Sequence, residues 1–213
     1  SEHGIMVGSR SDLRWAMGHL PRIRKMIIEQ LVDSKVISEL VKDFYNESNE
    51  RISASLMRTY FPVRTDPEMV VEIRESWNNF DDYLAAFSSK YRVRANSIRK
   101  NFQNVEAVRL QAQDIDRYRD EINLLYDYVY KKAPVRLFRL NADYFHSLAR
   151  KLGQQFVFTA FFRDGKMIAF SSAIFNAKSL EAHYIGIDYS LNKDLCIYQN
   201  LLYQFIESGI AFG

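Results

Sequence analysis

The chain has 213 residues, of which 47% are hydrophobic and 26% are charged, and its formal net charge is +3. This balance is typical of a globular protein of one large or two small domains; it excludes a disordered chain and argues against a histone-like polycation. The longest apolar stretch, Phe156–Phe162, is far shorter than the roughly 20 residues of a membrane-spanning helix. No basic-then-apolar segment opens the sequence. The single cysteine, Cys196, excludes an intrachain disulfide and fits a reducing setting, so we expect a cytoplasmic protein.

The first 75 residues are expected to hold helices and one strand. Apolar spacing predicts a helix over Arg22–Val32, and Asn49 is placed to cap a short helix that ends before Pro62. The segment Ser34–Phe44 combines helical spacing with the β-branched content of a buried strand, so both structures stay open. The segment Glu68–Ile73, with the sequence EMVVEI, is predicted as a strand.

Helices are predicted to predominate between residues 78 and 153, each beginning at an Asn or Asp cap. The expected elements are a helix from Asn78 or Asn79 to Phe102 that is bent or interrupted near Ser88–Ser89, a strand over Val105–Leu110, a helix from Asp114 to about Lys132, and a helix from Asn141 that ends at Gly153.

The last third is predicted as a meander of three strands followed by a helix. The strands are expected at residues 155–162, 166–175 and 180–187. Asp164-Gly165 between the first two is a dipeptide that favours a two-residue hairpin turn with positive φ at both positions. Asn192 is predicted to cap a helix that runs from Lys193 to about Ser208.

Three segments carry a family resemblance. They are FDDYLAAFSSKYRVR at residues 80–94, DGKMIAF at residues 164–170, and AHYIGIDYSLNKDLCIYQNLLYQFIESGI at residues 182–210. They resemble the GNAT-like acyltransferases allied to the Fem-type peptidoglycan aminoacyltransferases, over about residues 35–213. The resemblance implies an α+β fold with a GNAT-like mixed sheet flanked by helices and truncated at the C-terminus. It also implies a bacterial transferase that moves an acyl or aminoacyl group from a CoA-, tRNA- or carrier-linked donor to an amine.

The resemblance further implies parts of two GNAT-like units. Residues 1–75 resemble the back half of one unit, residues 76–104 form a basic connecting segment, and residues 105–213 resemble the front half of a second unit. The turn at residues 188–193 lacks the glycines that usually bind the pyrophosphate of coenzyme A, and the sequence stops after the next helix, which predicts a fragment of a longer protein. Acyl-CoA is therefore one donor among several, and a non-catalytic module that recognises a cell-envelope precursor or a partner is the alternative.

Two segments are predicted to bind anions. The basic residues Lys90, Arg92 and Arg94, with Arg99 and Lys100 after them, are candidates to bind a phosphate-bearing substrate; the alternative is a solvated helix face. The strand-to-helix turn is a candidate pyrophosphate site, because a helix N-terminus favours anions; the alternative is an ordinary capped helix. Its polar residues are Asp188, Ser190, Asn192 and Lys193.

Candidate catalytic residues follow on the last strand and helix. Alternation places His183 on the same face as Ile185, where it is either a base for the attacking amine or a core histidine bonded to a carbonyl. Tyr189 and Tyr198 are candidate proton donors to the leaving group, or core tyrosines. Gly186 marks either a bulge or close packing. The histidines show no metal-ligand spacing, so no metal site is predicted.

The expected partners are a small-molecule or carrier-linked acyl donor and, less favoured, tRNA. A basic helix at residues 90–100 with Tyr83 and Tyr91 suits RNA binding, but the near-neutral net charge argues against it. A sheet that stops after the predicted final helix leaves an open strand edge, which is a template for association. We expect residues 34–73 to cover that edge in a monomer, with a homodimer as the alternative.

Overall fold

The computed structural model of the chain divides into two compact units, residues 1–68 and 69–213. It describes residues 69–134, 136, 139–176 and 179–212. The elements predicted before residue 68 therefore lie outside the described residues, and the division of the chain at residues 75 and 104 stays a prediction.

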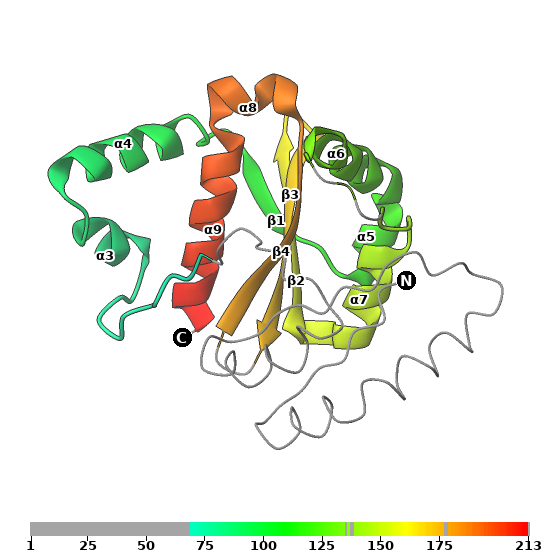
Figure 1. The fold of residues 1–213 in the computed structure, drawn as a ribbon, viewed down its shortest axis with the longest axis horizontal. Helices are drawn as coiled ribbons and strands as arrows, with labels where there is room; N and C mark the ends of the chain where they lie inside the picture. Colours follow the sequence, from blue (N-terminus) through cyan, green and yellow to red (C-terminus); the bar gives the residue numbers. More distant parts are fainter. Residues whose placement is uncertain (1–68, 135, 137–138, 177–178, 213) are drawn as a thin grey trace, which may run out of the picture. The chain divides into compact units, whose positions relative to one another are not determined.

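A four-stranded sheet with helices on both faces makes up this unit (Figure 1). Its elements are, in chain order, α3 (Phe80–Ala85), α4 (Ser89–Lys100), β1 (Glu106–Arg109), α5 (Ala112–Arg117), α6 (Arg119–Lys132), α7 (Tyr144–Leu152), the 3-10 helix η2 (Gly153–Gln155), β2 (Phe156–Arg163), β3 (Lys166–Asn176), β4 (Ser179–Ile187), α8 (Tyr189–Leu195) and α9 (Ile197–Phe212). The predicted α+β class and the three-strand meander are confirmed.

The strands lie in the order β1-β2-β3-β4, and each neighbouring pair is antiparallel. The hairpin between β2 and β3 turns at Asp164 and Gly165, whose φ angles are 52° and 75°. Positive φ at both positions is the geometry predicted for this dipeptide. Within the described residues β1 and β4 are the two edge strands.

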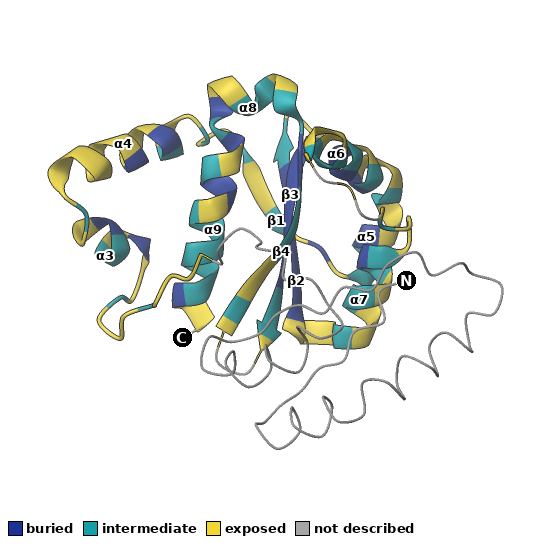
Figure 2. Ribbon diagram, in the orientation of Figure 1, coloured by how far each residue is buried: buried dark blue, intermediate teal, exposed yellow. Residues whose placement is uncertain are grey.

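Two apolar clusters attach the helices to the sheet. On one face, Phe158 and Phe170 pack with Ile122 of α6, and α5 and α7 complete that layer. On the other face, Ile187 packs with Leu201 of α9. Figure 2 shows the buried residues concentrated on the central strands and on the helix faces turned toward them. Full burial of such a side chain contributes about 1.5–3 kcal/mol, so the two clusters hold the layers together.

Helices α3 and α4 lie on the side of α9 away from the sheet (Figure 1). Phe80 and Ala95 are buried against Tyr203 of α9 and its neighbours. The Asn79 side chain caps α3 by accepting the backbone N–H of Asp81. The predicted cap and the predicted interruption near Ser88 are both confirmed. The basic segment thus forms a layer packed on α9.

Two helices that the sequence predicts as continuous are each divided. The helical geometry is interrupted at Tyr118, between α5 and α6. Asp114 is not the cap of α5 but lies in its first turn, where its carboxylate accepts the backbone N–H of Gln111. Between α8 and α9 the helical geometry is interrupted at Cys196, which has a left-handed φ of 51°. The predictions were wrong because the apolar spacing runs on across a break of one residue.

The strand predicted over Glu68–Ile73 is wrong in its described part. Residues 69–74 form no strand, and Met69 and Val70 are 91% and 78% exposed. Apolar side chains form a strand only where a neighbouring strand pairs with them, and β1 and β4 have no such partner among the described residues. The prediction that residues 34–73 cover the sheet edge therefore fails for 69–73. Monomer or homodimer stays a prediction.

Candidate functional site

The turn from β4 into α8 is the first candidate site. The Asp188 carboxylate caps α8 by accepting the backbone N–H of Ser190 at 3.1 Å and its hydroxyl at 2.5 Å. Lys166 Nζ lies 3.5 Å from the other carboxylate oxygen. Burial raises the pKa of Asp188, but the bonds from Ser190 and the charge of Lys166 outweigh it, and the net pKa is below its ordinary value. An ionised carboxylate therefore occupies the helix terminus at which a pyrophosphate is predicted.

Asn192 lies within α8 and caps the following helix, α9. Its Oδ1 accepts the backbone N–H of Tyr198 at 2.9 Å, in the first turn of α9. Its acceptor is therefore used in the fold. Lys193 is exposed on α8, and no ion pair joins it to another described residue. Of the four predicted donor-binding residues, Lys193 has the side chain best placed to meet a ligand.

The structure adds a cation that sequence reasoning missed. Lys132, at the end of α6, places its Nζ 3.8 Å from the centre of the Tyr189 ring. Burial, and then the neighbouring Tyr198, raises the pKa of Tyr189 above its ordinary value. Tyr189 therefore keeps its proton near neutral pH, as a proton donor must. No local pattern links Lys132 to Tyr189, because α7 and the whole meander separate them in the sequence.

A tyrosine and a histidine lie in contact on the face of β4 that is turned toward α7. The Tyr144 hydroxyl lies 2.8 Å from His183 Nε2, and the two rings stack with their centres 5.8 Å apart. Tyr144 comes from the first turn of α7, and both side chains are half-buried. A hydroxyl hydrogen-bonded to an imidazole can pass a proton in either direction. Sequence reasoning found His183 but missed Tyr144.

A bulge in β4 determines where His183 lies. The pairing of β3 with β4 shifts between Ser171 and Ala173, so two residues of β4, His183 and Tyr184, oppose Ser172 alone. The fully buried Ser172 hydroxyl donates to the Tyr184 carbonyl oxygen and accepts the Tyr184 N–H, both at 3.0 Å. One serine side chain thus replaces the missing ladder bonds.

The bulge overturns the predicted face of His183. The alternation of side chains along a strand predicts His183 on the same face as Ile185. In the structure Ile185 packs toward α9, whereas His183 lies against Tyr144 of α7. The extra residue breaks the two-residue period and rotates His183 to the other face. Gly186 lies beyond the bulge and has a packing role, because a Cβ there would overlap the Phe170 ring.

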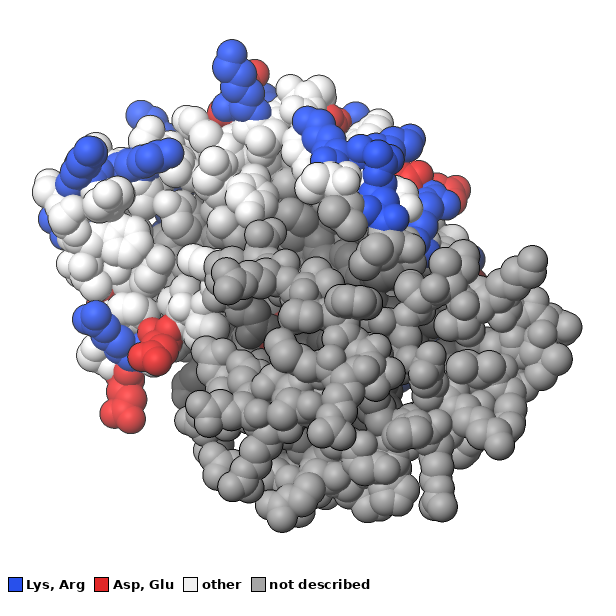
Figure 3. Space-filling model, in the orientation of Figure 1, with Lys and Arg blue, Asp and Glu red and all other residues white. Residues whose placement is uncertain are grey.

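The predicted substrate-binding residues form a separate group. Lys90, Arg92 and Arg94 are exposed on the first half of α4, over which Lys and Arg side chains gather in Figure 3. Arg92 donates to the Phe87 carbonyl oxygen at 3.5 Å. No hydrogen bond or ion pair between described residues joins these three to the turn at residues 188–193. The predicted common cleft stays a prediction.

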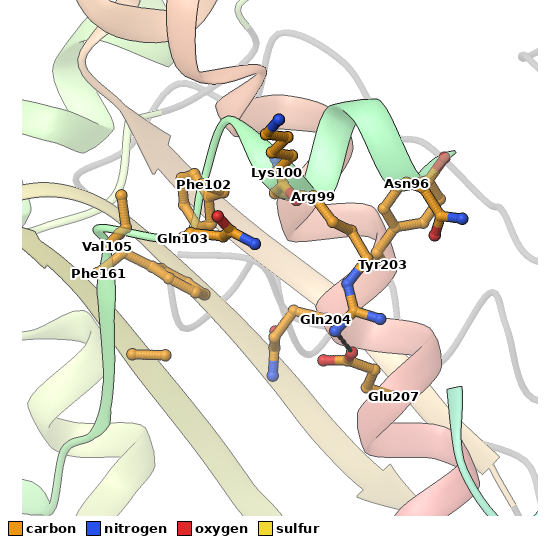
Figure 4. Close-up of a pocket in the computed structure, with 12 residues that line it drawn as sticks. Asn96, Arg99, Lys100, Phe102, Gln103, Val105, Phe161, Tyr203, Gln204 and Glu207 are labelled. Atoms are coloured by element: carbon orange, nitrogen blue, oxygen red, sulfur yellow. Dashed lines mark ion pairs between the residues drawn. The ribbon is translucent and has the colours of Figure 1, made fainter. Parts of the chain in front are cut away.

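A cavity of about 570 Å³ lies between α4, α9 and the β1 edge (Figure 4). Its lining residues are Asn96, Arg99, Lys100, Phe102, Gln103, Val105, Ala107, Phe161, Asn200, Tyr203, Gln204 and Glu207. An ion pair of 2.9 Å joins Arg99 to Glu207. Burial raises the pKa of Glu207 above its ordinary value, and the Arg99 charge opposes the rise. Of the predicted basic segment, only its last two cations line this cavity.

The described residues contain neither a candidate metal-binding group nor a candidate membrane-spanning helix. Their His, Cys, Asp and Glu side chains include no group of three or more that could hold a metal ion. Of the described helices, none combines the length and the apolar character needed to cross a membrane.

The fold and these sites define an α+β protein with a histidine-bearing bulge and a carboxylate-capped turn. The chain belongs to the FemAB-like family, described as peptidoglycan biosynthesis/recognition, whose match covers residues 18–212. The Fem-type resemblance is thereby confirmed.

No curated protein matches the chain. Two solved structures of an aminoglycoside acetyltransferase, meta-AAC0020 from an uncultured soil metagenomic sample, are similar to it. The complex with sisomicin is 13% identical, with a TM-score of 0.33 over 51% of this chain and 74% of that one. The complex with trehalose is 12% identical, with a TM-score of 0.32 over 47% and 70%.

Proposed function

We propose that the chain is an acyl- or aminoacyl-transferase that acts on an amine of a peptidoglycan precursor. The observation that carries this proposal is its membership of a peptidoglycan biosynthesis family over residues 18–212. The donor is CoA-, tRNA- or carrier-linked, and the compartment is the bacterial cytoplasm, where activated donors of these kinds are made.

The Tyr144–His183 pair supplies the proton transfer in this proposal. The acceptor nitrogen forms a bond to the acyl carbon, and its proton passes to the Tyr144 oxygen as the Tyr144 proton moves to His183 Nε2, 2.8 Å away. The bond from the acyl carbon to the thioester sulfur or ester oxygen breaks, and the leaving group takes the hydroxyl proton of Tyr189 or Tyr198, which regains one from water. The net result is one acyl group moved, and His183 is restored when it releases its proton to water.

Tyr189 and Tyr198 are the proposed proton donors to the leaving group, since the raised pKa of Tyr189 keeps its hydroxyl protonated. The phosphate groups of the donor are proposed to lie against Lys132 and Lys193 rather than on the backbone of α8, because Asp188 already caps that helix. The exposed cations Lys90, Arg92 and Arg94 on α4 then bind a second anionic part of a substrate.

A recognition module without turnover is the second candidate. The family description includes recognition as well as biosynthesis. The side chains of Asp188, Ser190 and Asn192 are engaged in the helix caps, which leaves the turn without the open anion site of a CoA enzyme. Such a module binds the precursor and forms no bond to it.

Variants of His183 and Tyr144, with a variant of His146 as the control, test the catalytic proposal. The full chain is incubated with radiolabelled acetyl-CoA or aminoacyl-tRNA and a precursor peptide that carries a free amine. We expect His183→Gln and Tyr144→Phe to reduce transfer about 100-fold or more, within the range for loss of general acid–base help. His146→Gln is the control, because His146 is hydrogen-bonded to the Ala112 carbonyl oxygen, at 3.0 Å, and lies outside the Tyr144–His183 pair. Equal loss in all three variants contradicts the proposal.

A further inference from the structure

We propose that the cavity between α4 and α9 binds a small carboxylate that carries an apolar body and a hydrogen-bond donor. This site is separate from the proposed reaction centre. The cavity is lined from β1 and β2 and from α9, whereas His183 lies on β4, at the other edge of the sheet, and faces α7. Its volume of about 570 Å³ lies within the range of about 300–1,000 Å³ that is usual for small-molecule sites.

One side of the cavity is apolar. Figure 4 shows Phe102, Val105 and Phe161 together on that side. The Phe102 and Phe161 rings lie with their centres 5.7 Å apart, and Phe161 is 2% exposed. Ala107 of β1 completes this wall and presents only a methyl group. An aromatic or branched aliphatic body of a ligand fits such a surface, because contact removes apolar area from water.

The other side carries a net positive charge. Arg99 and Glu207 neutralise each other through their 2.9 Å ion pair, and the Arg99 guanidinium also stacks over the Phe80 ring at 4.5 Å. Lys100 lines the cavity as well, and no ion pair joins it to any other described residue. One uncompensated cation at the mouth favours a ligand with a single negative charge.

Asn200 is the reason why the proposed ligand carries a hydrogen-bond donor. It lines the cavity, is 7% exposed, and its Nδ2 donates to the carbonyl oxygens of Ile98, Leu195 and Cys196. The three carbonyl partners identify the nitrogen, so the acceptor oxygen is the other atom of the amide. Among the described residues no donor reaches that oxygen, and because none of their fully buried side-chain oxygens lacks a partner, it is open to solvent. An accessible acceptor on a residue that lines the cavity suits a ligand with an N–H or O–H group.

Phenyllactate combines the three features and is the probe for the test. Hydrocinnamate lacks only its hydroxyl, and phenyllactamide replaces only its carboxylate with a neutral amide. Binding of each to the full chain is measured by isothermal titration and by saturation-transfer NMR. We expect phenyllactate to bind about 2- to 10-fold more tightly than hydrocinnamate, the worth of one hydrogen bond, and to outcompete phenyllactamide.

Two variants and one matched control locate the binding. Lys100→Ala weakens phenyllactate binding about 2- to 5-fold, the range of an exposed ion pair, and leaves phenyllactamide unaffected. Ala107→Trp fills the cavity from an exposed strand position and abolishes binding of all three compounds. Lys151→Ala removes the same charge from an exposed position on α7, outside the cavity, and leaves phenyllactate binding unchanged. Circular dichroism establishes that each variant is folded. The proposal is overturned if folded Ala107→Trp still binds phenyllactate, or if the wild-type chain binds none of the three.

Discussion

Substitution of Ser172 by alanine tests whether one buried hydroxyl holds the bulge of β4. The Ser172 hydroxyl makes two 3.0 Å hydrogen bonds to the backbone of Tyr184, and Ser172 is 0% exposed. A net value of about 0.5–1.5 kcal/mol for each bond gives about 1–3 kcal/mol of lost stability for Ser172→Ala. Urea unfolding of the full chain, followed by circular dichroism, measures this loss.

The neighbouring serine supplies a matched control. The Ser171 hydroxyl makes one bond, to Gln204 Oε1 at 2.9 Å, so Ser171→Ala should cost about half as much. Only Ser172→Ala should also move the NMR signals of His183, because only Ser172 sits opposite the bulge. Equal stability losses with an unmoved His183 signal would refute the idea that Ser172 positions the histidine.

Three further substitutions test the packing, the cap and the charge around the same strand and turn. Gly186→Val should destabilise the fold by about 1–3 kcal/mol in urea unfolding, because its Cβ would lie 2.8 Å from that of Leu125 and overlap Phe170; an unchanged midpoint contradicts this packing. Asn192→Ala should cost about 0.5–2 kcal/mol and increase amide exchange in the first turn of α9, whereas Asn192→Asp, which keeps the acceptor, should not. Asp188 has a lowered pKa in the folded chain, so its stabilising contribution is present above the unfolded pKa near 3.9 and is lost as pH falls through the folded pKa. The difference in unfolding free energy between wild type and Asp188→Asn should therefore shrink on acidification. A difference that stays constant with pH contradicts the lowered pKa of Asp188.

Local chemistry made part of this structure predictable. Asn79 caps α3 and Asp164-Gly165 turns the hairpin because each effect depends on a residue and its immediate neighbours. The breaks at Tyr118 and Cys196 were not predictable in the same way. A single residue outside helical geometry leaves the spacing of apolar side chains on either side almost unchanged, so the pattern is read as one helix.

The candidate sites depend on contacts between distant segments. His183 was found from its strand, but its partner Tyr144 comes from α7 and its face is set by a bulge that the alternation of β4 conceals. Lys132 reaches Tyr189 only because the last residue of α6 lies near the first residue of α8 in the fold. No spacing in the sequence encodes such pairs, and only the packing of the helices on the sheet brings them together.

A transferase must form a bond between an acyl group and an amine. Intact-mass measurement of a peptidoglycan-precursor peptide detects that bond, after incubation with the full chain and, in separate reactions, acetyl-CoA or aminoacyl-tRNA. We expect a mass increase of one acyl or aminoacyl group with one of these donors, and no increase with the His183→Gln chain. A precursor that binds the chain yet keeps its original mass with every donor would contradict the transferase account and favour a recognition module.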